Sequence, residues 1–189
     1  MRRGTLIVLA GPSGVGKGSV VERLLSRDPR GLVLSISATT RPARAGEVDG
    51  AEYRFVSDEE FDRLVRDGEL LEWAEVYPGL RYGTPHRPVD EHLERGIDVI
   101  LEIDVQGAAQ VRAHAPEAVQ ILLAPPSLAD LEARLRGRGT ETEAALAARL
   151  SSAERELEQA DRFDHVVVND DLERATQEVA AIIEASHRR

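Results

Sequence analysis

A glycine-rich segment between an apolar run and a helix-like segment constrains the fold of this chain more than any other feature. The apolar run extends from Thr5 to Ala10 and leads directly into the sequence GPSGVGK at residues 11–17. Apolar residues then recur between residues 20 and 25 with the spacing of one helix face. A glycine string between a strand and a helix is the context of a phosphate-binding loop, in which backbone N–H groups and the helix N-terminus surround phosphate oxygens.

The lysine at the end of this loop stands out in the composition. The chain has 24 basic residues, of which 23 are arginine, and Lys17 is its one lysine. A lysine in this position of a phosphate loop reaches the terminal phosphates. The alternative is a flexible turn with a solvated lysine, but the motif, its context and the solitary lysine together favour the loop.

The residues after the lysine depart from the usual motif. Ser or Thr normally follows the lysine directly and holds Mg2+ through its hydroxyl group. Here Gly18 takes that place, and the hydroxyl comes one residue later, at Ser19. The sequence therefore does not establish a direct protein ligand for the metal.

Short apolar runs recur along the chain and predict the fold class. After residues 5–10 they occur at 32–36, 97–103, 119–124 and 165–168, and they are rich in Val, Ile and Leu. Such runs are typical of strands that are buried on both faces of a parallel sheet. Segments with helical spacing lie between them, so we expect an α/β fold of three layers, with a parallel central sheet of the P-loop NTPase type.

Two segments interrupt this alternation. Residues 37–89 are polar and turn-rich and predict an inserted substrate-binding lobe, and a glycine pair near residue 137 predicts a helix end and a lid. No linker or repeat divides the chain, so we expect a single domain over residues 1–189. Its predicted parts are a core (about 1–36, 90–133 and 150–189), a lobe (about 37–89) and a lid (about 134–149).

Composition excludes several classes of function. The formal net charge of -10 argues against general affinity for nucleic acid, which requires a basic face. Cysteine is absent, and the five histidines show no ligand spacing, so we expect neither disulfides nor a structural zinc site. The first apolar run is too short for a signal peptide or a membrane span, and we expect a cytoplasmic location without membrane contact.

A second cluster of polar residues lies between Ser37 and Phe55. It contains hydroxyl groups, a tyrosine, and the arginines Arg41 and Arg44 three residues apart. Guanidinium groups bind phosphate oxygens in pairs, so such a cluster can surround a phosphate. Either arginine alone fits an ordinary surface position in this arginine-rich chain, and only the whole pattern indicates a site.

The two clusters resemble those of a known family. The order Gly-Lys-Gly-hydroxyl at residues 16–19 is similar to the loop of adenylate kinases and related nucleoside monophosphate kinases. The spacing from Thr39 through Tyr53 to Phe55 closely resembles the GMP-binding signature of guanylate kinases. Further segments that resemble this family lie at residues 71–74, 82–84, 102–107, 138–143 and 168–172. Glu102 stands where the family more often has Asp, and the loop at residues 78–81 is one residue longer than usual.

The resemblance implies an enzyme that uses ATP to phosphorylate GMP, and also dGMP, in purine nucleotide metabolism. It makes residues 37–89 a GMP-binding lobe and residues 134–149 a helical lid. The implied ATP-binding residues are Gly11, Pro12, Ser13, Gly14, Val15, Gly16, Lys17, Gly18, Ser19 and, near adenine, Asn169. The implied GMP-binding residues are Ser37, Arg41, Arg44, Tyr53 and Tyr82 for the phosphate and Glu72, Thr84 and Asp104 for guanine. The implied catalytic residues are Lys17, Arg41, Arg134, Arg138 and Arg149.

The resemblance also implies cofactors and partners. Mg2+ would accompany ATP and be held mainly by the nucleotide phosphates and water, with Ser19 or Asp104 in an outer position and no certain protein ligand. ATP and GMP would be the substrates, and both a monomer and a homo-oligomer stay open.

Two other functions stay open at this point. One is a catalytically inert guanylate-kinase-like domain that binds phosphorylated partners, and the other is a kinase for another small phosphorylated acceptor. The retention of Gly11, Gly16 and Lys17 argues against an inert domain. From spacing alone Arg134 and Arg138 also fit a solvated helix face, and Glu72 also fits a carboxylate at the rim of a cleft.

Overall fold

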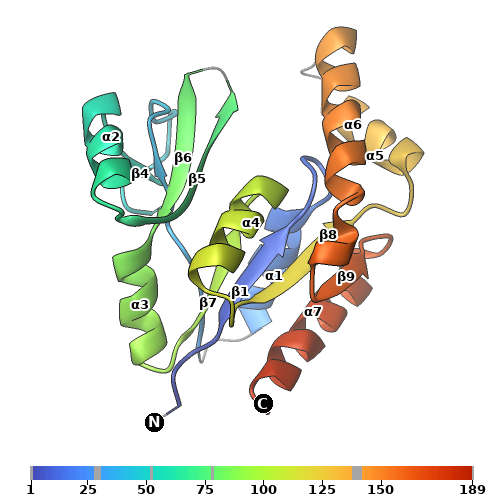
Figure 1. Cartoon of the computed structure of the whole chain (residues 1–189). Helices are drawn as coiled ribbons and strands as arrows, with labels where there is room; N and C mark the ends of the chain where they lie inside the picture. The colour runs from blue at the N-terminus through green and yellow to red at the C-terminus, as the bar shows by residue number, and fades with distance from the viewer. Residues whose placement is uncertain (1, 28–30, 52, 78, 138–141, 189) are drawn as a thin grey trace.

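The predicted apolar runs form a parallel sheet in the computed structural model, which describes residues 2–27, 31–51, 53–77, 79–137 and 142–188 (Figure 1). Every neighbouring pair of strands in this main sheet is parallel. The strand order is β2 (Leu32–Leu34), β7 (Asp98–Glu102), β1 (Leu6–Ala10), β8 (Val119–Ala124) and β9 (His165–Val168). The predicted α/β class with a parallel central sheet is thus confirmed.

Helices cover both faces of the main sheet. On one face, α1 (Lys17–Arg27) and α7 (Leu172–Ser186) pack Val20 and Val179 against the strands. On the other face, α3 (His86–Glu94) and α4 (Val105–His114) contribute Val89 and Val111. The strands are largely apolar because neighbouring residues of the central strands point alternately into these two cores.

The strand β2 ends earlier than the apolar pattern predicts. The run 32–36 predicts a strand to Ile36, but β2 ends at Leu34 and Ile36 is exposed. Ser35 still donates its N–H to the carbonyl of Ile100, at 3.0 Å, and the chain then leaves the edge of the main sheet. The apolar character of Ile36 therefore does not mark a strand residue.

Residues between β2 and α3 form a lobe with its own sheet. The strand order is β4 (Arg54–Phe55), β3 (Ala38–Thr39), β6 (Leu80–Pro85) and β5 (Leu70–Tyr77), and only β3 and β4 are parallel. The helix α2 (Asp58–Arg66) packs on this sheet with Phe61 and Leu64. The expected lobe boundary near residue 89 falls inside α3, whose Val89 and Leu93 belong to the core of the main sheet.

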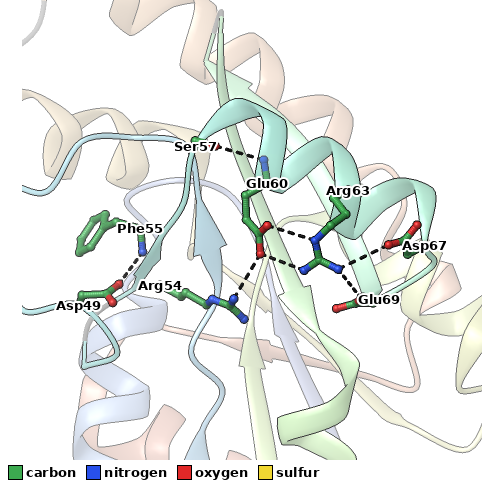
Figure 2. Close-up of polar contacts among 8 residues, drawn as sticks. All are labelled: Asp49, Arg54, Phe55, Ser57, Glu60, Arg63, Asp67 and Glu69. Carbon is green, nitrogen blue, oxygen red and sulfur yellow. Dashed lines mark hydrogen bonds and ion pairs between the residues drawn. The ribbon is translucent and has the colours of Figure 1, made fainter.

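Figure 2 shows how polar contacts fix α2 on the outside of the lobe. Ser57 caps the helix, because its hydroxyl oxygen accepts from the N–H of Glu60 at 3.2 Å. Arg63 donates to Glu60 at 2.9 and 3.1 Å and to Glu69 at 2.8 Å, and Arg54 reaches Glu60 at 3.4 Å. Exposed ion pairs contribute little free energy each, so the main effect of this network is to orient α2 against β4 and the start of β5.

The lid segment consists of two packed helices. Leu131 and Leu135 of α5 (Leu128–Arg136) contact Leu146 and Ala153 of α6 (Glu143–Leu157). Thr142 caps α6, because its side-chain oxygen accepts from the N–H of Ala145. Arg138, a predicted catalytic residue, lies outside the described residues. A short 3-10 turn, η1 (Ala160–Arg162), joins α6 to β9. Among the helices in the described parts of the chain, none is long and apolar enough to cross a membrane.

Candidate active site

A cleft of about 600 Å³ lies where the carboxyl ends of the main-sheet strands meet the lobe and α6. In open α/β sheets, ligands bind at this edge of the sheet. The lining residues come from the glycine-rich loop, β2 and the segment after it, the lobe, the β7–α4 region and α6. They are Gly11, Ser13, Lys17, Leu34, Ser35, Ser37, Tyr53, Glu72, Ala74, Glu75, Val76, Tyr82, Glu102, Ile103, Asp104, Gln106, Ala148, Arg149, Ser152 and Glu156.

The glycine-rich loop has a backbone that other residues do not readily adopt. Gly11, Gly14 and Gly16 have φ values of 143°, 85° and 102°. A Cβ atom on Gly11 would lie 2.3 Å from the carbonyl oxygen of Leu123, and one on Gly16 would lie 2.5 Å from the side-chain Nδ2 atom of Asn169. Both conformation and space therefore require glycine here, and the loop curls as a phosphate-binding loop does.

Lys17 lies at the first turn of α1 and lines the cleft. Its Nζ atom donates to the carbonyl oxygens of Gly11, at 2.6 Å, and of Pro12, at 3.2 Å. The ammonium group thus spans the mouth of the loop. A phosphate bound in the loop would compete for the same N–H donors.

Asn169 and Arg134 support the loop from behind. The buried Asn169 donates its side-chain N–H to the carbonyl of Val15 at 2.8 Å. Arg134 donates to the same carbonyl at 3.2 Å and to the backbone oxygen of Asn169 at 2.7 Å. Neither residue lines the cleft in this structure. The predicted contacts of Asn169 with adenine and of Arg134 with the transferred phosphate stay predictions.

Arg149 reaches the loop from the other side of the cleft. It projects from α6, and its guanidinium donates to the hydroxyl of Ser13 at 2.9 Å. Arg149 therefore brings a positive charge from the lid to the phosphate loop. This is the place where a cation would stabilise charge between two phosphate groups.

A buried carboxyl group forms the lobe side of the cleft. Glu72 is 5% exposed and lies on β5, directly opposite Thr84 of β6 in the strand register. The Thr84 hydroxyl donates to Glu72 Oε1 at 2.6 Å. Burial raises the pKa of Glu72 to about 7, and the negative charge of Asp104 adds to the effect, while the Thr84 hydrogen bond opposes it. Glu72 is therefore not the solvated rim carboxylate that its sequence also fitted.

The second oxygen of Glu72 lies close to the first turn of α4. A Cβ atom on Gly107 would stand 2.7 Å from Glu72 Oε2. Asp104 caps the same turn, because its Oδ1 atom accepts from the N–H of Gly107 at 2.7 Å. Glycine at position 107 thus allows α4 to approach the carboxyl group, and Glu72 and Asp104 both line the cleft.

Tyrosines and a serine form the remaining wall of the lobe side. The rings of Tyr53 and Tyr82 meet edge to face with centroids 5.8 Å apart, and both line the cleft with Ser37. Burial raises the pKa of Tyr53, so its hydroxyl stays protonated and is able to donate. Asp49 fixes the adjacent strand by accepting from the N–H of Phe55 at 2.8 Å (Figure 2).

The predicted arginines of the lobe are held by an acidic residue that the sequence did not single out. Arg41 is 9% exposed and donates to the two carboxylate oxygens of Glu47 at 3.0 and 2.9 Å. Its guanidinium also lies 5.3 Å from the centre of the Tyr53 ring. Arg44 is exposed, and its backbone N–H donates to Glu47 at 2.7 Å. Neither arginine lines the cleft in this structure.

Two further carboxyl groups line the cleft beside Lys17. Desolvation by the walls of the cleft raises the pKa of Glu102, whose side chain still reaches solvent, and the charge of Lys17 opposes this effect. Burial likewise raises the pKa of Glu156, whose carboxylate accepts from the Ser152 hydroxyl at 3.1 Å. The place of Glu102 at the end of a predicted strand, two residues before Asp104, could have identified it as a site residue from the sequence. Nothing in the sequence identified Glu156, because a glutamate on a long helix is usually solvated.

Comparisons with known proteins agree with this geometry. Residues 3–186 match the family model described as guanylate kinase. A guanylate kinase of Synechococcus sp. (strain CC9311) is 57% identical over 172 residues, which cover 91% of this chain and 90% of that protein. A guanylate kinase of Rhodococcus jostii (strain RHA1) is 52% identical over 97% of this chain and 88% of that protein. The crystal structure of guanylate kinase from Anaplasma phagocytophilum superposes with a TM-score of 0.80 at 34% identity, and the match covers 100% of this chain and 88% of that one.

Proposed function

This chain belongs to the guanylate kinase family and phosphorylates GMP with ATP, and we propose that it does so in the cleft between the glycine-rich loop and Glu72. One observation supports this proposal above the others. Lys17 at the loop and the buried Glu72–Thr84 pair line or adjoin a single cleft, although they are far apart in sequence. The loop end of the cleft suits a nucleoside triphosphate. The Glu72 end suits a base with adjacent N–H donors.

The chemistry requires positioning and charge rather than a strong base. A phosphate monoester has its second pKa near 6, so at neutral pH the attacking oxygen of GMP is already largely ionised. The main obstacle is to bring two polyanions together in line in a protein of net charge -10. Lys17 and Arg149, which line the cleft from opposite sides, would neutralise this charge.

Glu72 would read the base. Guanine presents N1–H and an exocyclic amino group side by side, and one carboxylate accepts from both. Thr84 already holds one oxygen of Glu72, and Asp104 lies close enough to influence its pKa. Adenine has an unprotonated N1 at this edge and would leave the buried carboxylate facing a lone pair.

The phosphate of GMP would lie by the tyrosines. We propose that Ser37, Tyr53 and Tyr82 donate to its oxygens from the wall of the cleft. Arg41 and Arg44 would approach with the loop that Glu47 holds, since neither lines the cleft in this structure. Closure of the lid, which includes Arg134, Arg138 and Arg149, would exclude water and limit wasteful hydrolysis of ATP.

The residues at the loop fit a magnesium ion that arrives with ATP. Carboxylate and hydroxyl oxygens suit Mg2+, and Glu102, Asp104 and the exposed Ser19 lie around the start of α1 and the end of β7. The described residues contain no group of three acidic or histidine side chains able to hold a metal by themselves. We propose that nucleotide phosphates and water hold the ion, with Ser19 or Asp104 in an outer position. When bound, Mg2+ supplies positive charge at the phosphate oxygens.

The substrates follow from the family, whereas the setting of the enzyme is part of the proposal. We expect it to act in the cytoplasm, on free ATP and GMP, without nucleic acid or membrane. Both a monomer and a homo-oligomer are compatible with a cleft built from one chain.

A coupled assay of ADP formation with four acceptors tests the proposed site and its specificity. We expect GMP to be the best acceptor, dGMP to be used, and AMP to have a specificity constant at least about a thousandfold lower. UMP should be equally poor. A preference for AMP or UMP would contradict base reading by Glu72, and tight nucleotide binding without turnover would indicate a binding domain.

A further inference from the structure

The outer edge of the lobe sheet is hydrogen-bonded by side chains of α4. The strand β5 is an edge strand, paired with β6 on one side only. On its other side, the Gln110 side chain accepts from the N–H of Trp73 at 3.1 Å and donates to the carbonyl of Trp73 at 2.8 Å. His114, one turn further along α4, donates from Nδ1 to the carbonyl of Leu71 at 2.9 Å.

These contacts substitute for a neighbouring strand. The amide of Gln110 presents one acceptor and one donor to one residue, as the backbone of a paired strand does. The carbonyl of Leu71 only accepts, so His114 must carry its proton on Nδ1, and this bond persists whether or not the ring is charged. The edge of β5 is thereby bound to α4 at Leu71 and Trp73.

The residue between these two positions is Glu72. Leu71 and Trp73 line a cavity of about 430 Å³ behind β5, whereas Glu72 lines the nucleotide cleft. The backbone on both sides of Glu72 is therefore attached to α4. The same helix begins at Asp104 and passes Glu72 Oε2 at Gly107.

Among the described elements, α4 and β5 make the most extensive contact between the core and the lobe. The chain itself passes between them after β2 and again between β6 and α3. The bonds from Gln110 and His114 add a non-covalent connection at β5. Glu72 lies on the lobe side of this connection and Asp104 on the core side.

We propose that Gln110, assisted by His114, is a positioning residue for base selection. It holds β5 at the register in which Glu72 and Asp104 face the same purine edge. This inference rests on the proposed role of Glu72 in reading guanine. Gln110 lines the cavity behind β5 and does not line the cleft.

IMP is the probe that isolates this effect. It keeps the N1–H of GMP and lacks the 2-amino group, so the ratio of specificity constants for GMP and IMP reports how well Glu72 is aligned. With Glu72 in place, the wild type should prefer GMP by about ten- to a hundredfold, as expected for one charge-assisted hydrogen bond.

Two variants of Gln110 remove different numbers of its hydrogen bonds to the Trp73 backbone. Gln110→Met removes both bonds at similar length, and Gln110→Glu keeps the acceptor for the Trp73 N–H but loses the donor to the Trp73 carbonyl. We expect the GMP/IMP ratio to fall by at least about fivefold in Gln110→Met and by at least about twofold in Gln110→Glu. The KM for ATP should stay within about threefold of wild type. Gln177→Met, on the exposed side of α7, is the matched control and should leave the ratio unchanged.

Melting midpoints measured alongside separate positioning from folding. A lowered midpoint with an unchanged GMP/IMP ratio would show that Gln110 only stabilises the fold, and would overturn the inference. If Gln110→Met does not fold, the ratio in Gln110→Glu decides, and a wild-type value there also overturns it. A wild-type enzyme that uses GMP and IMP equally well would refute the proposed role of Glu72 instead.

Discussion

The buried carboxyl of Glu72 should lower the stability of the folded protein as the pH rises, and Glu72→Gln should remove this effect. The pKa of Glu72 is about 7 in the folded protein, against 4.5 for an ordinary glutamate. Between these values the folded state binds more protons than the unfolded state, so stability falls with rising pH until the group is ionised in both states. Below about pH 4.5 the group contributes nothing, and above about pH 7 the full cost is present.

The size of the effect follows from the two pKa values. Each pH unit between them corresponds to about 1.4 kcal/mol. Ionising Glu72 inside the fold thus costs about 3 kcal/mol, of which about 2.5 kcal/mol develops between pH 5 and pH 8. Glutamine keeps an oxygen that accepts from Thr84 and carries no charge to desolvate. The stability of Glu72→Gln relative to wild type should therefore rise by about 2.5 kcal/mol over this interval.

Urea unfolding at pH 5, 6, 7 and 8 measures this difference. Trp73 is the one tryptophan of the chain and adjoins Glu72, so its fluorescence reports the lobe, and far-ultraviolet circular dichroism reports the whole fold. Glu178→Gln, an exposed change on α7, is the control and should differ from wild type by no more than about 0.5 kcal/mol at every pH. A difference for Glu72→Gln that stays constant from pH 5 to pH 8 would refute the argument.

Three further substitutions test other parts of the site. Lys17→Arg should lower kcat more than tenfold, a loss above roughly 1.4 kcal/mol, because a broad guanidinium does not replace the compact ammonium that reaches Gly11 and the phosphates. A kcat of Lys17→Arg above about a tenth of the wild-type value, measured by steady-state kinetics, would exclude this role. Ser19→Ala should be mild, within about threefold in kcat, and a loss of several hundredfold that excess magnesium restores would identify Ser19 as a direct ligand. Gly107→Ala should lower kcat/KM for GMP by about tenfold and leave the KM for ATP unchanged, because its Cβ would stand 2.7 Å from Glu72 Oε2. Gly31→Ala, where a Cβ meets nothing within 4 Å, is the matched control, and equal effects of the two changes would contradict the crowding.

The parts of the fold that the sequence predicted are those set by local patterns. Residues 119–124 and 165–168 form strands with the predicted bounds, because short runs rich in Val, Ile and Leu favour strands. The glycine-rich loop could also be predicted from the sequence, since its backbone requires glycine at fixed places. The hairpin of β5 and β6 was not predicted. Its strand β5 contains a buried glutamate, Glu72, and a charged residue does not mark a buried strand in the sequence.

Site residues that act through distant contacts could not be read in this way. Glu47 holds Arg41 within one loop, yet nothing in the local pattern separates it from other acidic residues there. Gln110 and Glu156 lie on helices whose neighbours become known only when the lobe and the lid are placed. Asn169 was selected from the resemblance, but its bond to Val15 behind the loop needed the structure.

Steady-state kinetics of Glu72→Gln at pH 8, with ATP and GMP varied in turn, test the central claim that this carboxyl group reads guanine. Glutamine turns one acceptor into a donor, which faces an N–H group of the base. We predict that kcat/KM for GMP falls by more than about tenfold, while the apparent affinity for ATP stays within about threefold of wild type. An unchanged constant for GMP, or an equal loss for both substrates, would show that Glu72 is structural and that guanine is read elsewhere.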